Sequence, residues 1–504
     1  MQFTSYLDNL TAYPVHFNPK MKNIKLITLL KSYTEDEWVS YEKFIKANDV
    51  ISPRKYLPLV TQLRKNISLP FQKIDIEQIF TKAFGKSGFK LQTINNRQTE
   101  LLKISEKFLI DLALKKSPLA EENFLTHELG ERGLAKNLEE VFRRADRKIE
   151  KFGYEPEMLA MAHATALNKA SFKQSMGINR EFFNDFFEHS LLYLADAMNF
   201  LYRNGYEFVL QKSYNIDFEF NPLLEFLNLS DADALMTKIE KLKKPYFIIP
   251  VIRYYLFKSA SMDNNEEYAM KAEKLFFAHQ NKFPDYMRVE FYRMLMSHYL
   301  IKINGGEHKY FSNLFYLCDR KLKSNLLDDF KVATYPANMF REYIIAGLET
   351  RKYSWVENFL NNYTKYLPEN VREDEYSLGM IRLYISKENF RKALEIIEKS
   401  ASVNIVHRLD TSRYKLICLY ELDMTEECEA EYDKLKRFIK NGKKIPVMNK
   451  DANTGFLEKY FFLLKYKLTG KSKDIGFRFK DMKAGKQNVI GKGWLLKKAE
   501  EITG

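Results

Sequence analysis

The stretch Tyr376–Ser400, YSLGMIRLYISKENFRKALEIIEKS, contains two amphipathic helical patterns joined by a short turn, and it decides the fold class. Related pairs occur before and after it, spaced 38, 46, 37 and 37 residues apart, with equivalent positions at Ala272, Tyr310, Val356, Ala393 and Ala430. Each pair of helices has an apolar face that it can bury only against the next pair. The period therefore predicts an all-α protein whose second half is a stack of about five helical hairpins.

The repeated unit has a packing pattern as well as a length. Ala272 is followed four residues later by the bulky Phe276 and then by Pro284, and the next clear unit has Val356 followed by Pro368. A small residue lets two helices approach closely, the bulky residue fills the neighbouring groove, and proline ends the hairpin. The pattern therefore predicts close helix packing within each unit and a break between units.

This order of residues, over a unit of about 34 positions, resembles the tetratricopeptide repeat family. The resemblance covers roughly Tyr246 to Gly442, although Leu378 and Gly379 lie two positions early relative to Tyr384. It implies a right-handed α-solenoid that binds a protein or peptide. The layout also resembles large uncharacterised proteins of bacteria rich in Lys, Asn and Phe, a resemblance that implies no activity.

Glycine and proline are scarce, at 19 and 14 residues, which favours long helices over a many-stranded sheet. The patterns predict a possible disordered extension over 1–20, a small helical domain over 21–117 and a helical bundle or irregular hairpins over 118–243. They further predict the repeats over 244–442 and a basic C-terminal helical cap over 443–504. Met21 is an alternative first residue of the folded chain.

Three local patterns make specific structural predictions. Thr34, with Glu37 three residues later, predicts a capping box at a helix start. Gly153 and Gly205 are placed where long helices could end. One wide stripe is expected to be covered on more than one side, and it consists of Phe182, Phe183, Phe186, Phe187, Leu191, Leu194 and Met198.

Composition and charge restrict the class of protein. The chain is 45% hydrophobic and 29% charged, which is typical of a globular protein. Its three cysteines, Cys318, Cys418 and Cys428, lack the spacing of a disulfide framework, and they favour a reducing compartment. No run reaches the roughly 18 apolar residues of a membrane span. We therefore expect a cytoplasmic protein.

The sequence offers no motif for catalysis, a cofactor or a metal. His127 and Glu128 begin HELGE, but Glu131 stands where the zinc motif has its second histidine. Gly305 and Gly306 lack the strand and the Lys-Ser/Thr ending of a phosphate loop, and they predict a turn between helices. We therefore expect no enzyme, no cofactor and no metal site, while an unrecognised active site between the N-terminal bundle and the repeats stays open.

The excess positive charge lies near one end. From Lys434 to Gly504 there are 19 basic and 6 acidic residues, so this segment carries +13 of the chain's net charge of +14. The candidate anion-binding residues are Lys436, Arg437, Lys440, Lys443, Lys444, Lys471, Lys473, Arg478 and Lys480. Basic residues beside aromatic ones such as Phe477 and Phe479 suit a nucleic-acid backbone. A solvated end cap, an acidic protein partner and an anionic membrane surface are the alternatives.

Two functions follow as hypotheses. The first is a non-catalytic scaffold that binds a protein or peptide on the inner helices of its repeats. Its candidate contact residues, some of which could equally be packing residues, are Tyr343, Tyr376, Arg382, Arg413 and Tyr414. The alternative is an RNA- or ribosome-associated factor that uses the basic end.

Overall fold

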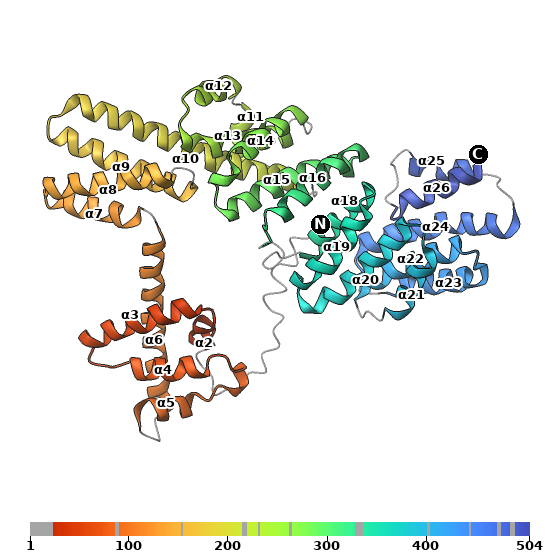
Figure 1. Ribbon diagram of the computed structural model, residues 1–504, viewed down its shortest axis with the longest axis horizontal. Coiled ribbons are helices and arrows are strands. Elements are labelled where there is room, and N and C mark those ends of the chain that lie inside the picture. The colour runs from red at the N-terminus through yellow and green to blue at the C-terminus, as the bar shows by residue number, and fades with distance from the viewer. Residues whose placement is uncertain are drawn as a thin grey trace. The chain divides into compact units, whose positions relative to one another are not determined.

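The structure, a computed structural model, is all-helical wherever it is described (Figure 1). The described residues are 24–85, 90–117, 119–152, 155–213, 219–229, 232–261, 265–327, 336–400, 404–442, 445–470, 475–483 and 489–503. The predicted all-α class is confirmed. The predicted extension over 1–20 and the predicted helix end at Gly153 lie outside these residues. The chain divides into two compact units, Met1–Pro284 and Asp285–Gly504, which are described separately.

The first part of unit 1 is a small helical module with its own core. Its helices are α2 (Ile24–Lys31), α3 (Glu35–Ile51), α4 (Leu57–Asn66), η1 (Phe71–Lys73), α5 (Ile76–Phe84) and α6 (Leu91–Lys116). Trp38, Tyr41 and Phe108 are buried together in its centre. The predicted capping box is confirmed, because Thr34 Oγ1 accepts the Glu37 N–H at 3.2 Å and Glu37 Oε2 accepts the Thr34 N–H at 3.0 Å.

The rest of unit 1 is built around the 35-residue helix α10, which packs along α9 and against α13 (Figure 1). The helices are α7 (Ala120–Glu131), α8 (Ala135–Phe152), α9 (Pro156–Ser175), α10 (Asn179–Ser213), α11 (Pro222–Leu229), α12 (Asp233–Lys241), η2 (Pro245–Phe247), α13 (Ile248–Ser261), α14 (Glu266–His279) and η3 (Gln280–Lys282). The predicted helix end at Gly205 is wrong, since Gly205 lies inside α10. A Cβ atom there would come 2.5 Å from Leu227 Cδ1, so glycine allows α11 to approach closely.

Unit 2 consists of helices that pack mainly on their neighbours in the chain. They are α15 (Asp285–Asn304), η4 (His308–Tyr310), α16 (Phe311–Lys323), α18 (Pro336–Glu349), α19 (Tyr353–Tyr363), η5 (Thr364–Tyr366), α20 (Glu369–Ser386), α21 (Phe390–Lys399), α22 (Ile405–Glu421), α23 (Thr425–Asn441), α24 (Val447–Thr469), α25 (Ile475–Lys483) and α26 (Lys492–Thr503). Pro284 and Pro368 directly precede α15 and α20, so each proline stands at a helix start.

Four turns of unit 2 share one backbone geometry, which joins α15 to η4 and α16, α18 to α19, α20 to α21, and α22 to α23. In each turn one residue is left-handed, namely Gly306, Arg351, Glu388 and Asp423, with φ of 98°, 57°, 55° and 60°. The N–H of the next residue donates to the carbonyl five residues earlier, at 2.8–3.0 Å. This is the hydrogen bond of a Schellman motif. The recurring turn is compatible with a helical-repeat fold, and it confirms the turn predicted at Gly305 and Gly306.

The turns also test the predicted register of the repeat. Val356 and Ala393, five residues after their left-handed turn residues, are buried as expected. In the last unit the corresponding residue is Cys428, which is buried, whereas Ala430 is exposed. The predicted position at Ala430 was therefore two residues late. The small-residue position of this unit is filled by a cysteine, which is small and apolar enough to replace the alanine that the pattern predicts.

Candidate functional site

The most unusual surface among the described residues is an aromatic face on α10. The sequence pattern predicted that this stripe would be covered on more than one side, and for three of its phenylalanines that prediction was wrong. Phe183 and Phe187 are 65% and 62% exposed, and Phe186 is 44% exposed. Tyr193 and Phe200 extend the same face, at 57% and 63% exposure. Large apolar side chains in such a continuous exposed row mark an interaction site more often than an ordinary surface.

The spacing and the charge of this face distinguish it from a mixed surface. Phe186, Tyr193 and Phe200 follow one another at intervals of seven residues, which places them on one side of the helix. The exposed residues of α10 between Glu181 and Arg203 are all uncharged, and they are Phe183, Asn184, Phe186, Phe187, Ser190, Tyr193 and Phe200. At 1.5 Å per residue, the face from 183 to 200 is about 25 Å long. We call these seven residues the α10 face.

The opposite side of α10 is buried by packing within unit 1. Leu192, Ala195, Tyr202 and Tyr206 are buried against the neighbouring helices, and Tyr202 meets Tyr254 of α13 with ring centroids 5.0 Å apart. A helix that is apolar all round is normally covered all round. The interval of seven residues is visible in the sequence and could have revealed the α10 face, but the stripe predicted from the sequence included Phe186 and left out Tyr193 and Phe200.

The five predicted contact residues on the inner helices have different surroundings. Tyr343 of α18 is fully buried, and its ring stacks on Phe359 at 5.4 Å. Tyr376 of α20 is half-buried, and its hydroxyl donates to Asn361 Oδ1 at 3.1 Å. Tyr343 therefore packs within unit 2 and presents no surface in this structure.

Arg382, Arg413 and Tyr414 are brought together around a carboxylate that the sequence reading did not single out. Arg413 donates to Asp410 Oδ1 at 2.8 Å, and an Nη of Arg382 lies 3.9 Å from Asp410 Oδ2. Arg382 Nε also donates to the Tyr414 hydroxyl at 2.9 Å. These four residues, which we call the arginine cluster, join α20 to α22.

Charge dominates the properties of this cluster. Burial acts to raise the pKa of Asp410, but Arg413 and Arg382 together hold that pKa below its usual value. At Tyr414, burial acts to raise the pKa of the phenol, but the same two arginines outweigh this effect and lower that pKa below its usual value. An Nη1 atom on each arginine is buried without a hydrogen-bond partner among the described residues. The cluster is therefore strongly coupled but not completely hydrogen-bonded within the chain.

An ion pair between an arginine and a glutamate joins α18 to α20 in the same way. Arg341 of α18 donates from Nε and Nη2 to the carboxylate of Glu375 on α20, at 2.7 and 2.5 Å. Glu375 is buried, and the Arg413 side chain is only 3% exposed. These ion pairs join α18 to α20 and α20 to α22 within unit 2.

The basic C-terminal residues are partly described. Lys436, Arg437 and Lys440 are exposed on α23, and Arg478 and Lys480 are exposed on α25. The remaining candidates, Lys443, Lys444, Lys471 and Lys473, lie outside the described residues. Of the two aromatic neighbours, Phe479 is buried and Phe477 is 79% exposed. Phe477 alone of these two could stack on a base.

One basic groove lies between α22 and α23. It has a volume of about 480 Å³ and is lined by Arg408, Ser412, Lys434, Leu435, Arg437, Phe438, Asn441 and Gly442. The Arg408 guanidinium lies 4.5 Å from the centre of the Phe438 ring. None of these lining residues is acidic, so the groove favours an anion.

Two further observations concern metals and membranes. Among the described residues, no group of three His, Cys, Asp or Glu side chains could hold a metal ion. In HELGE, His127 is exposed and Glu128 forms an ion pair with Arg132. Across the described ranges, no helix combines the length and hydropathy that crossing a membrane requires.

Comparisons of the chain with protein-family models, with curated proteins and with solved structures found no match. The functional reading therefore depends on the surfaces of the molecule itself.

Proposed function

We propose that the protein is a non-catalytic helical-repeat scaffold that binds a partner protein. The observation that carries this proposal is the α10 face, where five aromatic side chains are exposed in an uncharged row. Interface cores are enriched in aromatic residues and depleted in charge, and this face has both properties. In this proposal the hairpins of unit 2 form a right-handed, tetratricopeptide-like solenoid, which the four equal turns support.

The partner that fits the α10 face is an apolar helix of another protein. The interval of seven residues matches the spacing with which one helix packs into another. The face has about the length of five helical turns, and it offers no charged residue to a charged partner. A helix with apolar residues at i, i+3 and i+7 and no charge on that side would bury it.

The test compares the double variant Phe183→Ser and Phe187→Ser with the wild type, each produced in its native cells and isolated after nuclease treatment. We expect the wild type to retain a defined protein in stoichiometric amount and the double variant to lose it. Cross-linking with mass spectrometry should place that partner within reach of α10. The matched control is Phe477→Ser, because Phe477 of α25 is also a largely exposed phenylalanine, at 79%, but lies in unit 2.

Three results would reject the proposal. The first is retention of the same partner by the double variant, and the second is loss of it in the Phe477→Ser control as well. The third is a wild type that binds only a second copy of itself through the α10 face. In that third case sedimentation velocity would show a dimer that the double variant lacks.

A second candidate function is binding of RNA or another nucleic acid, and the basic groove between α22 and α23 favours it. Arg408 and Arg437 bring two guanidinium groups and Ser412 a hydroxyl to a groove without an acidic lining residue. Phosphate contacts of this kind give affinity that falls steeply with salt. We expect the double variant Arg408→Glu and Arg437→Glu to bind single-stranded RNA at least ten-fold more weakly, with a shallower salt dependence. Arg391→Glu, an exposed arginine of α21, is the control, and equal affinities would reject this function.

A further inference from the structure

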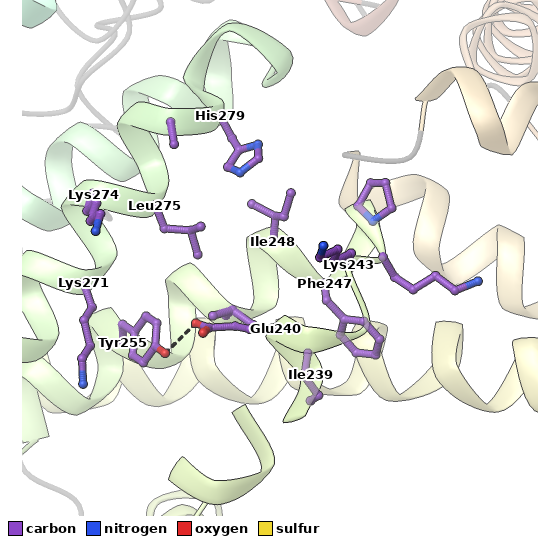
Figure 2. A pocket seen from close by; sticks show the side chains of 14 residues that line it. Ile239, Glu240, Lys243, Phe247, Ile248, Tyr255, Lys271, Lys274, Leu275 and His279 are labelled. Atoms are coloured by element: carbon purple, nitrogen blue, oxygen red, sulfur yellow. Dashed lines mark hydrogen bonds between the residues drawn. The ribbon is translucent and has the colours of Figure 1, made fainter. Parts of the chain in front are cut away.

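Unit 1 contains a cavity of about 610 Å³ that is independent of the α10 face (Figure 2). It lies among the end of α12, the turn that leads into α13, and one side of α14. Its volume is within the range of about 300–1,000 Å³ that small-molecule sites occupy. All the residues that line it belong to one compact unit, so their arrangement does not depend on unit 2.

The floor of the cavity is apolar. Ile239, Phe247 and Val251 are almost fully buried beneath it. Ile248 and Leu275 are half-buried, and their side chains point toward one another across the open space in Figure 2. A ligand that fills this space would therefore remove apolar surface from water, which is the main source of affinity for a nonpolar group.

The rim of the cavity is positively charged. Four lysines line it, Lys243, Lys244, Lys271 and Lys274, against the single lining carboxylate of Glu240. The Glu240 carboxylate already has a hydrogen-bond partner, because its Oε1 accepts a hydrogen bond from the Tyr255 hydroxyl at 2.7 Å. The rim therefore attracts a negative charge, and the floor beneath it does not.

Two of the four lysines are engaged outside the cavity. Lys244 lies 2.9 Å from Glu188, and Lys271 lies 2.7 Å from Glu267 and over the ring of Tyr268. Lys243 and Lys274 are exposed, and the described residues give neither of them an ion pair. These two ammonium groups stand on different elements on the rim of the same cavity, and they are the ones available to a ligand.

We propose that this cavity binds a small amphipathic anion, with its acidic head between Lys243 and Lys274 and its apolar body on the floor of Ile239, Phe247 and Val251. Lysine is a compact, strongly hydrated charge on a flexible stem, so it suits a carboxylate or phosphate head that stays partly in water. The apolar body excludes a free inorganic ion as the intended ligand. The inference does not depend on the proposed partner protein, because no residue of the α10 face lines the cavity.

The backbone conformation of Lys243 allows its ammonium group to be removed without destabilising the fold. Its φ is 52°, a left-handed conformation that a residue with a Cβ atom adopts only at a cost. Glycine adopts this conformation freely, so Lys243→Gly removes the ammonium group without straining the backbone. A loss of binding in this variant could not be attributed to unfolding if its melting temperature is unchanged or higher.

The experiment is isothermal titration of the whole chain with decanoate below its micelle concentration. Decyl phosphate provides the other acidic head, methyl decanoate is the neutral ligand, and inorganic phosphate lacks the apolar body. We expect saturable 1:1 binding of decanoate or decyl phosphate, at least ten-fold weaker binding of methyl decanoate, and no binding of phosphate alone. Lys243→Gly and Lys274→Gln should each weaken binding about ten-fold. Lys238→Gln, an exposed lysine of α12 that does not line the cavity, should leave it unchanged.

The proposal fails if neither amphipathic anion binds saturably, or if inorganic phosphate binds as tightly as decyl phosphate. It also fails if both lysine variants keep the wild-type affinity, because the anion would then occupy another place, such as the α10 face. In that last case Phe183→Ser and Phe187→Ser would weaken decanoate binding, and the cavity would have no part in it.

Discussion

The α10 face of unit 1 and the arginine cluster of unit 2 have opposite compositions and opposite surroundings. The α10 face is aromatic and exposed, whereas the cluster is charged, with Asp410 and Arg413 buried and Arg382 half-buried. The phenylalanines were predicted to be covered, and this was wrong for three of them, whereas Arg382 and Arg413 were predicted either to contact a partner or to pack inside. The comparison teaches that a helical pattern tells which residues share a side of a helix. It does not tell which sides the neighbouring helices cover.

The largest expected effect is at the arginine cluster. Asp410→Ala would leave Arg413 and Arg382 buried without their carboxylate, and removing one partner of a buried pair costs about 3–5 kcal/mol. Amide hydrogen exchange across α22 in the whole chain should report this loss of local stability. Glu357→Ala breaks the largely exposed pair with Lys387 and should cost at most about 1 kcal/mol. If the two variants lost the same amount of local stability, the arginine cluster would be no more shielded from solvent than the exposed pair of Glu357 and Lys387.

The next largest effect is on the covered side of α10. Leu192 is 3% exposed, and truncation of a buried leucine to alanine costs about 2–5 kcal/mol because it leaves a cavity. Leu192→Ala should therefore lower the midpoint of thermal unfolding of unit 1 by several degrees, as followed by differential scanning calorimetry. If the midpoint stayed constant, α10 would not be anchored through this side, and the contrast between its two faces would be lost.

The arginine cluster should also make the stability of unit 2 depend on pH at the acidic end. Arg413 and Arg382 lower the pKa of Asp410 in the folded state, so the ionised form stabilises the fold above the ordinary aspartate pKa of about 3.9. That contribution is lost as the pH falls through the lowered pKa. The difference in hydrogen exchange of α22 between wild type and Asp410→Asn should therefore shrink below about pH 4. A difference that stays constant down to pH 2 would contradict the assigned role of Asp410.

Local features of the fold could be predicted from the sequence because they depend on residues close together in the chain. The capping box at Thr34 needs only Glu37, three residues away, and the turn at Gly306 needs only the helix before it. Gly205 shows the limit, because its role is set by Leu227 on a helix that follows later in the chain. A glycine inside a helix and a glycine after one look alike until the packing partner is known.

The candidate sites were harder to predict for the same reason. Arg382, Arg413 and Tyr414 were predicted to lie on inner helices of the repeats, and they lie on α20 and α22. Asp410, which pairs with both arginines, was not linked to them. The cavity in unit 1 joins Lys243 and Lys274, which are separated by the whole of α13, and neither residue belongs to a motif. The net charge of the sequence favoured the C-terminal segment as the anion-binding region. The charge available to a ligand, however, depends on which lysines already form ion pairs, and that follows from the packing.

The smallest expected effect on stability is at the α10 face, and it gives the sharpest test of the comparison. Phe187→Ser removes an aromatic ring that is 62% exposed, so the free energy of unfolding should change by no more than about 0.5 kcal/mol. Together with the loss caused by Leu192→Ala, five residues later and about 140° around the helix, this result would separate the two sides of one helix. Chemical denaturation of the isolated protein measures the change. A loss of 2 kcal/mol or more, as for a buried phenylalanine, would mean that α10 is covered within the chain, and the face would then no longer be available to a partner.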